Sequence, residues 1–339
     1  MAETVLVTGG TGYIAGWCIV ELLQRGYTVR TTVRSLAKEK QVRAAVASVV
    51  DAGDRLTIYA ADLTADAGWD AAVAGCDYML HVASPLGMDN VKDPNELIVP
   101  ARDGALRVLR AATKANVKRV VMTSACAASS PSSYSEVGVT DETLWTNPDD
   151  PTLSPYRKSK TVAELAAWEF MKTHQGATTL TTILPGAVFG PVLSAEGAGS
   201  VQVIGRLLKG SMPGTPRLAF EIVDVRDLAD VHIRAMTSPQ AGGERFIAVS
   251  EFMWMAEMAT ALRSKLGAAA SKVPTRALPD FVMRLLALFD PAIRAITPGL
   301  GRRHRHSAAK AQRVLGWQPR PAAVTVVECG ESLIARQMV

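Results

Sequence analysis

The sequence predicts an α/β fold, a doubly wound parallel sheet with a smaller, mostly helical C-terminal lobe. Short β-branched segments alternate with helical patterns through the first half of the chain. Those segments are apolar almost throughout, as strands covered on both faces are. A glycine-rich turn joins the first segment to the first helical pattern. Alternation of this kind builds βαβ units and therefore a parallel sheet.

The expected elements follow one another regularly up to residue 185. Strands are expected at 4–8, 27–33, 55–60, 77–83, 119–124 and 179–185, and helices at 14–25, 36–50, 66–74, 96–115 and 155–173. A strand–helix unit returns at 221–236 and a further strand at 245–249. We therefore expect one domain over residues 1–184, with returning segments at about 219–250. Residues 185–218 and 251–339 would form the second lobe.

Composition excludes several classes of protein. The 339 residues, 48% of them hydrophobic, suffice for a large core. The net charge of +5 comes from 37 basic and 32 acidic residues without long runs. The sharpest basic cluster, residues 301–306, is expected to be a solvated loop, because no aromatic platform or known nucleic-acid motif accompanies it. We therefore expect no nucleic-acid partner.

The cysteines and the apolar segments indicate a cytoplasmic protein. Four cysteines without a close pair suit neither a disulfide framework nor a zinc site, so we expect free thiols and no metal. A strand pattern starts directly after the first residues, with no signal-peptide pattern before it. Charged residues interrupt the apolar segment 277–296 too often for it to span a bilayer, and its helical spacing predicts a packed amphipathic helix. We expect no membrane partner, and a monomer or homodimer.

The turn after the first strand predicts a dinucleotide site. Gly9, Gly12 and Ala15 have the spacing G-x-x-G-x-x-A. A turn without side chains lets backbone N–H groups and the helix N-terminus approach a pyrophosphate, which places Thr11, Tyr13 and Ile14 in the binding set. An ordinary glycine-rich turn is the alternative. The position at the first strand–helix turn of a parallel sheet favours the dinucleotide.

The end of the second strand indicates which dinucleotide binds. A cofactor with a bare ribose requires an acidic residue there, and the sequence has Arg34 instead, followed by Lys38. A guanidinium or ammonium group at this place pairs with a 2′-phosphate. We therefore expect NADPH/NADP+ rather than NADH. The alternative is that these cations only begin an exposed, charged helix.

Tyr156 and Lys160 predict proton-transfer chemistry. They are four residues apart behind Pro155, so they lie one turn apart on one face of a helix. A nearby ammonium group favours the phenolate and lowers the pKa of the phenol. The phenol can then protonate a carbonyl oxygen or accept a proton from an alcohol. A solvated helix start is the alternative, and the dinucleotide pattern before it favours the catalytic interpretation.

Several further motifs complete the pattern. They are TGGTGYIA at the first turn, Asp62-Leu63, HVASP at 81–85, TSA at the end of the fifth strand, YRKSK, LPGAVFGP at 184–191, VDVRDLADVHI at 223–233 and LGWQPR at 315–320. With them the chain resembles an extended short-chain dehydrogenase/reductase of the dihydroflavonol reductase, cinnamoyl-CoA reductase and microbial aldehyde/ketone reductase group. The resemblance covers nearly the whole chain and is specific for the superfamily rather than for a substrate.

The resemblance implies roles for individual residues. Asp62 and Leu63 would frame the adenine, and Val82, Ala83 and Ser84 would line the path to the nicotinamide ribose. The nicotinamide would contact Pro185, Gly186, Ala187 and Val188. Ser200 would contact the phosphates, and Thr123 would belong to the cofactor site. Lys160 would also hold the ribose. Asp224 and Asp227 are expected to be cap and salt-bridge residues.

One position departs from the family pattern. The family carries a serine that hydrogen-bonds the substrate oxygen, and the aligned residue here is Ala125. Ser124 could take this role, or Ser129, or the enzyme could work without it; we expect Ser124. Losing one preorganised donor costs about 10²–10³ in rate, so the departure affects efficiency more than reaction class.

Taken together, these patterns predict an NADPH-dependent carbonyl reductase. The small-molecule substrate would be an aldehyde or ketone, reduced reversibly to an alcohol by Tyr156, Lys160 and Ser124. Apolar loop residues indicate that it is bulky or aromatic: Val192, Leu193, Met212 and Phe220. The alternatives are an NAD-dependent sugar-nucleotide epimerase/dehydratase, which Arg34 disfavours, and a non-catalytic NADP(H)-binding sensor, which the tyrosine–lysine pair disfavours.

Overall fold

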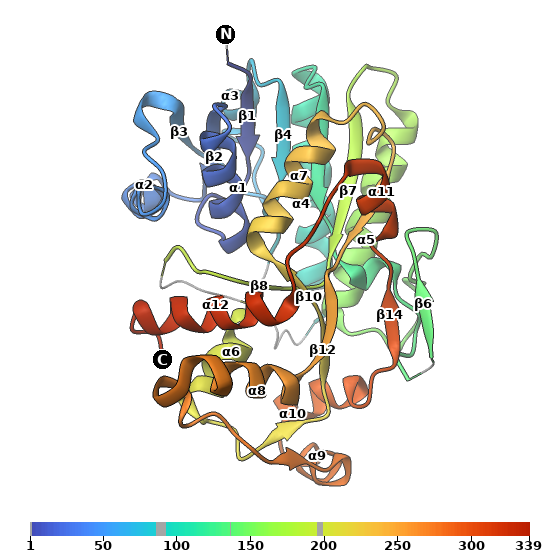
Figure 1. The fold of residues 1–339 in the computed structure, drawn as a ribbon. Coiled ribbons are helices and arrows are strands. Elements are labelled where there is room, and N and C mark those ends of the chain that lie inside the picture. Colours follow the sequence, from blue (N-terminus) through green and yellow to red (C-terminus); the bar gives the residue numbers. More distant parts are fainter. Residues whose placement is uncertain (1, 86–92, 136, 195–198) are drawn as a thin grey trace.

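A sheet of seven parallel strands forms the centre of the molecule (Figure 1). The computed structural model describes residues 2–85, 93–135, 137–194 and 199–339. In sheet order the strands are β11 (Arg245–Ala248), β7 (Thr179–Pro185), β5 (Arg119–Thr123), β4 (Tyr78–His81), β1 (Thr4–Val7), β2 (Thr28–Val33) and β3 (Leu56–Ala60). The order runs outwards in both directions from β1 and β4, so the predicted doubly wound parallel sheet is confirmed.

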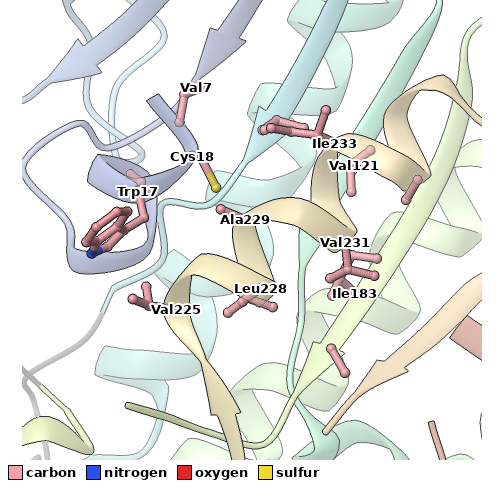
Figure 2. Packing of buried hydrophobic residues seen from close by; sticks show 14 of the residues in the cluster. Val7, Trp17, Cys18, Val121, Ile183, Val225, Leu228, Ala229, Val231 and Ile233 are labelled. Carbon is pink, nitrogen blue, oxygen red and sulfur yellow. The ribbon is translucent and has the colours of Figure 1, made fainter. Parts of the chain in front are cut away.

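Helices cover both faces of this sheet. One face carries α1 (Tyr13–Gln24), α2 (Glu39–Ala47), α7 (Val225–Thr237) and α11 (Ala309–Leu315), and the other α3 (Trp69–Val73), α4 (Asn95–Lys114) and α5 (Pro155–Thr173). Figure 2 shows the first face, where Cys18 of α1 and Leu228 of α7 meet Val121 and Ile183 of the sheet. Successive strand residues point to opposite faces, which is why β4 sends Leu80 to this cluster and Met79 to the other.

A third apolar cluster lies at the carboxyl ends of the strands. It surrounds a small sheet of β8 (Ala187–Phe189), β10 (Ala219–Asp224) and β12 (Glu251–Trp254) with the helices α6 (Val201–Lys209), α8 (Met255–Leu266) and α12 (Ala322–Ala335). Two short strand pairs complete the fold: β9 (Thr215–Pro216) with β13 (Ala277–Leu278), and β6 (Gly138–Thr140) with β14 (His304–His306). The division into two domains stays a prediction, and residues 195–198 of its segment 185–218 lie outside the described residues.

The segment 277–296 differs from the packed amphipathic helix that its spacing predicted. It forms two short helices, α9 (Asp280–Leu286) and α10 (Pro291–Ile296). Phe281, Leu285 and Leu288 are exposed, while Met283 and Ala287 are buried. The prediction was wrong because Pro291 cannot continue a helix, so one long apolar face never forms.

The basic cluster at 301–306 is also not the solvated loop that we expected. His304 and His306 are buried in β14, and Arg302 binds the buried carboxylate of Glu221. The imidazole of His306 contacts that same carboxylate. A loop segment far away in the sequence supplies the partner strand β6, so the cluster joins the C-terminal part of the chain to the segment before α5.

The aspartates at the start of α7 and the cysteines have the surroundings that the sequence predicted. Asp224 accepts a hydrogen bond from Arg226 N at the start of α7 and pairs with Arg226 and Arg320, and Asp227 pairs with Arg320, as predicted. All four cysteines are buried free thiols. Among the described residues, no helix is both long and apolar enough to cross a bilayer, and no cluster of three His, Cys, Asp or Glu side chains is placed to hold a metal ion.

Candidate active site

The glycine turn between β1 and α1 has a backbone that only glycine suits. Gly9 has a φ of +77°, and a Cβ atom there would lie 2.9 Å from Ala83 Cβ. Gly9 N donates to Thr32 Oγ1 at 3.0 Å and Gly10 N to Thr32 O at 2.8 Å, which fixes the turn against β2. Gly12 begins α1 without a side-chain cap. Backbone N–H groups at such a helix N-terminus bind phosphate groups, so this turn fits the pyrophosphate of a dinucleotide.

The first turn of α1 also contacts the segment after β8. The hydroxyl of Tyr13 donates to Gly190 O at 2.8 Å, just after β8, and burial raises the pKa of this phenol. Thr11 and Ile14 are half-buried. A hollow beside the turn is lined by Gly10, Thr11, Gly12, Tyr13, Gly16, Gln41, Val42, Ala45, Val192, Leu193 and Ser194. Val192 and Leu193, predicted to contact the substrate, thus lie beside the glycine turn and are largely buried.

The ends of β2 and β3 bring the adenine and 2′-phosphate candidates together. Arg34 follows β2 directly and is exposed, as is Lys38 four residues later. Asp62 follows β3 and accepts hydrogen bonds from the N–H and hydroxyl of Thr64, which lower its pKa together with the nearby Arg34 guanidinium. Leu63 packs against α4. Arg34 and Lys38 are thus exposed cations at the place expected for the 2′-phosphate of the adenosine ribose.

Tyr156 and Lys160 occupy the first two turns of α5. Ser154 begins this helix by accepting a hydrogen bond from Arg157 N at 3.3 Å, and Pro155 takes the first helical position. Tyr156 is 40% exposed, whereas Lys160 is only 8% exposed. Burial lowers the pKa of Lys160 to about 8, although the Glu164 carboxylate acts to raise it. An accessible phenol therefore stands one turn from a buried ammonium group that shares its helix face.

The end of β4 contributes a residue that sequence reasoning did not single out. His81 is buried, and its Nδ1 lies 3.0 Å from the hydroxyl of Thr8 at the end of β1. The same hydroxyl accepts hydrogen bonds from Val82 N and Ala83 N. Burial, with Lys160 nearby, lowers the pKa of His81 to about 3. A neutral imidazole thus lies close to Lys160, and the predicted cofactor segment 82–84 is hydrogen-bonded to the glycine turn.

The hydroxyls at the end of β5 are engaged within the protein. Thr123 Oγ1 lies 2.7 Å from His232 Nε2 on the α7 side. Ser124 Oγ donates to Glu164 Oε2 at 2.6 Å on the α5 side, and Ser129 Oγ donates to Asp141 O at 2.7 Å. The Ser124 hydroxyl therefore donates its proton to a buried carboxylate within the protein, and its contact with the substrate oxygen stays a prediction. The side chain of Thr123 is likewise turned into the core.

The segment after β7 carries the residues predicted to contact the nicotinamide. Pro185 ends β7 and pairs with Ala248 of β11, and Gly186 N donates to Ala248 O at 3.2 Å. A Cβ atom on Gly186 would lie 2.2 Å from Glu221 O, so the approach of β10 requires glycine here. Val188 is half-buried in β8, and Ser200 begins α6 without a side-chain cap. Residues 195–198, which precede Ser200 in the sequence, lie outside the described residues.

Comparisons with known proteins agree with this geometry. The profile of the NAD dependent epimerase/dehydratase family matches residues 5–248. A cinnamoyl-CoA reductase of Medicago truncatula is 39% identical over 249 residues, covering 72% of this chain and 75% of that protein. An anthocyanidin reductase of Vitis vinifera is 34% identical over 288 residues, covering 80% and 83%. The solved structure of Gre2 from Candida albicans with NADPH has a TM-score of 0.80 at 26% identity, covering 98% and 99%. By sequence and fold, the chain belongs to the NAD dependent epimerase/dehydratase family, the extended short-chain dehydrogenases/reductases.

Proposed function

We propose that this chain is an NADPH-dependent reductase of an aldehyde or ketone with a bulky or aromatic substituent. One observation carries the proposal: the accessible Tyr156 phenol lies one helical turn from the buried Lys160 ammonium, which is near His81 at the carboxyl end of β4. Ligands of open α/β sheets bind at that edge. The names of the two similar reductases, a cinnamoyl-CoA reductase and an anthocyanidin reductase, specify substrates with aromatic groups, which supports an aromatic substrate here.

The residues of the site have distinct tasks in this reaction. When bound, the nicotinamide cofactor supplies the hydride. Tyr156 protonates the carbonyl oxygen as it gains charge, and the Lys160 ammonium stabilises the phenolate that remains. The hydroxyls of Ser124 and Ser129 are engaged elsewhere, so Tyr156 works without a serine from this segment. We therefore infer that the chain catalyses the same class of reaction more slowly than enzymes of the family that carry the substrate-binding serine.

NADPH consumption tests the proposal directly. Purified protein is mixed with NADPH and a panel of aromatic aldehydes, aryl ketones and small aliphatic carbonyls, and the loss of NADPH absorbance is followed. We expect turnover that is fastest with the bulky aromatic members. A protein that binds NADPH tightly yet turns over no member of the panel would contradict the reductase and favour the sensor. Epimerisation of a sugar nucleotide with NAD+ would favour the alternative enzyme.

Replacing Arg34 by serine tests the choice of cofactor. A charge-assisted hydrogen bond to the 2′-phosphate contributes about 1.5–3 kcal/mol. The Kd of NADPH should therefore rise about 10- to 100-fold, while the Kd of NADH, which lacks this phosphate, should change little. Fluorescence titration of both cofactors measures this. Arg43→Ser is the matched control, because Arg43 is paired with Glu39 on α2. Equal weakening of both cofactors by Arg34→Ser would show that Arg34 does not read the phosphate.

A further inference from the structure

A buried carboxylate lies directly behind the catalytic pair. Glu164 follows Lys160 by one further turn of α5 and is fully buried. Its Oε2 accepts from Ser124 Oγ at 2.6 Å, and its Oε1 from Thr182 Oγ1 at 2.7 Å and Arg245 Nε at 2.8 Å. Trp168 Nε1 adds a longer bond of 3.3 Å to Oε1. The partners come from β7, β11, the residue after β5 and α5 itself, so one side chain joins the helix to three neighbouring strands or their ends.

These bonds determine how α5 sits on the sheet. Ser124 is itself held by its backbone N–H, which donates to Ile183 O of β7 at 2.8 Å. The guanidinium of Arg245 also donates to Ala128 O at 3.1 Å and Leu144 O at 3.0 Å, both in the segment between β5 and α5. Rotation of α5 about its axis would break this set of bonds. Because Tyr156 and Lys160 lie on the same helix, the carboxylate fixes where both groups point.

The charge of Glu164 acts on the same pair. Lys160 lies near His81 of β4, which is neutral, and near Glu164, one turn further along its own helix. Burial favours loss of the Lys160 proton, and Glu164 opposes that loss. Arg245 partly offsets this effect, since its guanidinium pairs with the carboxylate and is itself stacked 3.5 Å from the Trp145 ring centroid. The protonation of Lys160 thus depends on the balance between a buried anion and a buried cation.

We propose that Glu164 is a positioning residue for the Tyr156–Lys160 pair. It holds α5 in register against β5 and β7, and it supplies the negative charge that keeps the Lys160 ammonium protonated in a desolvated site. The charge part of this inference concerns the protein alone, whereas its consequence for turnover rests on the proposed reductase function.

The titration of Lys160 tests the charge directly and needs no turnover. The full chain is labelled with ¹³Cε-lysine, and the Lys160 signal is assigned by its loss in Lys160→Arg. We expect Glu164→Gln, which keeps the amide oxygen as an acceptor, to lower the titration midpoint of Lys160 by about one pH unit. Arg245→Gln should move it in the opposite direction, because the carboxylate then acts on Lys160 without its guanidinium partner. A purely structural role would not give shifts of opposite sign.

Matched variants complete the test. Thr182→Val removes one hydrogen bond from Glu164 and no charge, so it should leave the midpoint in place. Glu164→Asp retains the negative charge, so the titration midpoint of Lys160 should stay near that of the wild type. Its shorter side chain cannot reach Ser124 and Thr182 together. Its kcat should fall about 10- to 100-fold from misalignment of Tyr156.

Two results would overturn the inference: an unchanged midpoint in folded Glu164→Gln, or a downward shift in Arg245→Gln. If Glu164→Gln does not fold, the direction of the Arg245→Gln shift decides the question. A wild type without reductase activity would refute the proposed function but leave this titration readable, so the two failures are distinguishable.

Discussion

Replacing Tyr156 by phenylalanine is expected to reduce kcat by about 10²- to 10⁴-fold. The change removes one oxygen from a side chain that is 40% exposed, so it leaves packing intact and removes the proton donor. NADPH should bind with nearly unchanged affinity, because the glycine turn and the end of β2 are untouched. Single-turnover measurements of NADPH oxidation, with fluorescence titration of NADPH binding, separate these two effects.

Tyr78→Phe is the control for this variant. Tyr78 begins β4 at the amino edge of the sheet, where the Lys118 ammonium lies 5.3 Å from its ring centroid, and it should keep full activity. If Tyr156→Phe retained a tenth or more of the wild-type rate, Tyr156 would not be the proton donor. If the chain were a non-catalytic NADP(H)-binding sensor, the wild type itself would show no turnover.

Replacing Trp317 by alanine is expected to lower the free energy of unfolding by about 3–5 kcal/mol. Trp317 is fully buried among the residues of α7 and α11, and its indole N–H donates to Asp227 O at 2.9 Å. The substitution leaves a large cavity and removes one hydrogen bond to that carbonyl. Urea denaturation followed by fluorescence and circular dichroism should show a lower midpoint.

Phe289→Ala is the matched control for stability. Phe289 is 81% exposed, so its loss should change the free energy of unfolding by about 0.5 kcal/mol or less. A loss below about 1 kcal/mol in Trp317→Ala would mean that the C-terminal segment closes over the gap and that Trp317 does not anchor it. The comparison also tests whether the LGWQPR motif acts through packing rather than through chemistry.

Much of the central sheet could be read directly from the sequence because its signals are local. Each strand of the large sheet is a short apolar segment, and each covering helix carries its own periodicity. Predicted and observed ranges of α5 are the same, 155–173, since Ser154 and Pro155 define its start. The small sheet of β8, β10 and β12 was not anticipated, because its strands are separated by irregular segments and pair only through tertiary contacts.

Some residues of the candidate site could likewise be predicted from local spacing, and others could not. Gly9 and Gly12 form one turn, and Tyr156 and Lys160 lie within one helix, so spacing alone brought each set together. The function of Ser124 could not be read in this manner. Its hydroxyl could donate either to a substrate or to a group within the protein. The structure shows that it donates to Glu164, 40 residues further along the chain. The one available signal for Glu164 was its position four residues after Lys160 on the same helix face.

By itself, the sequence determined the parallel sheet, the dinucleotide turn, the cation in place of an acid after β2, and the tyrosine–lysine spacing. All of these follow from steric preferences and side-chain chemistry within a few neighbouring residues. Only the tertiary structure decided that His304–His306 form a strand with two buried histidines and that Ser124 donates to a carboxylate inside the protein. Those outcomes depend on which distant groups share a dry interior, where every buried charge and hydroxyl must find its partner.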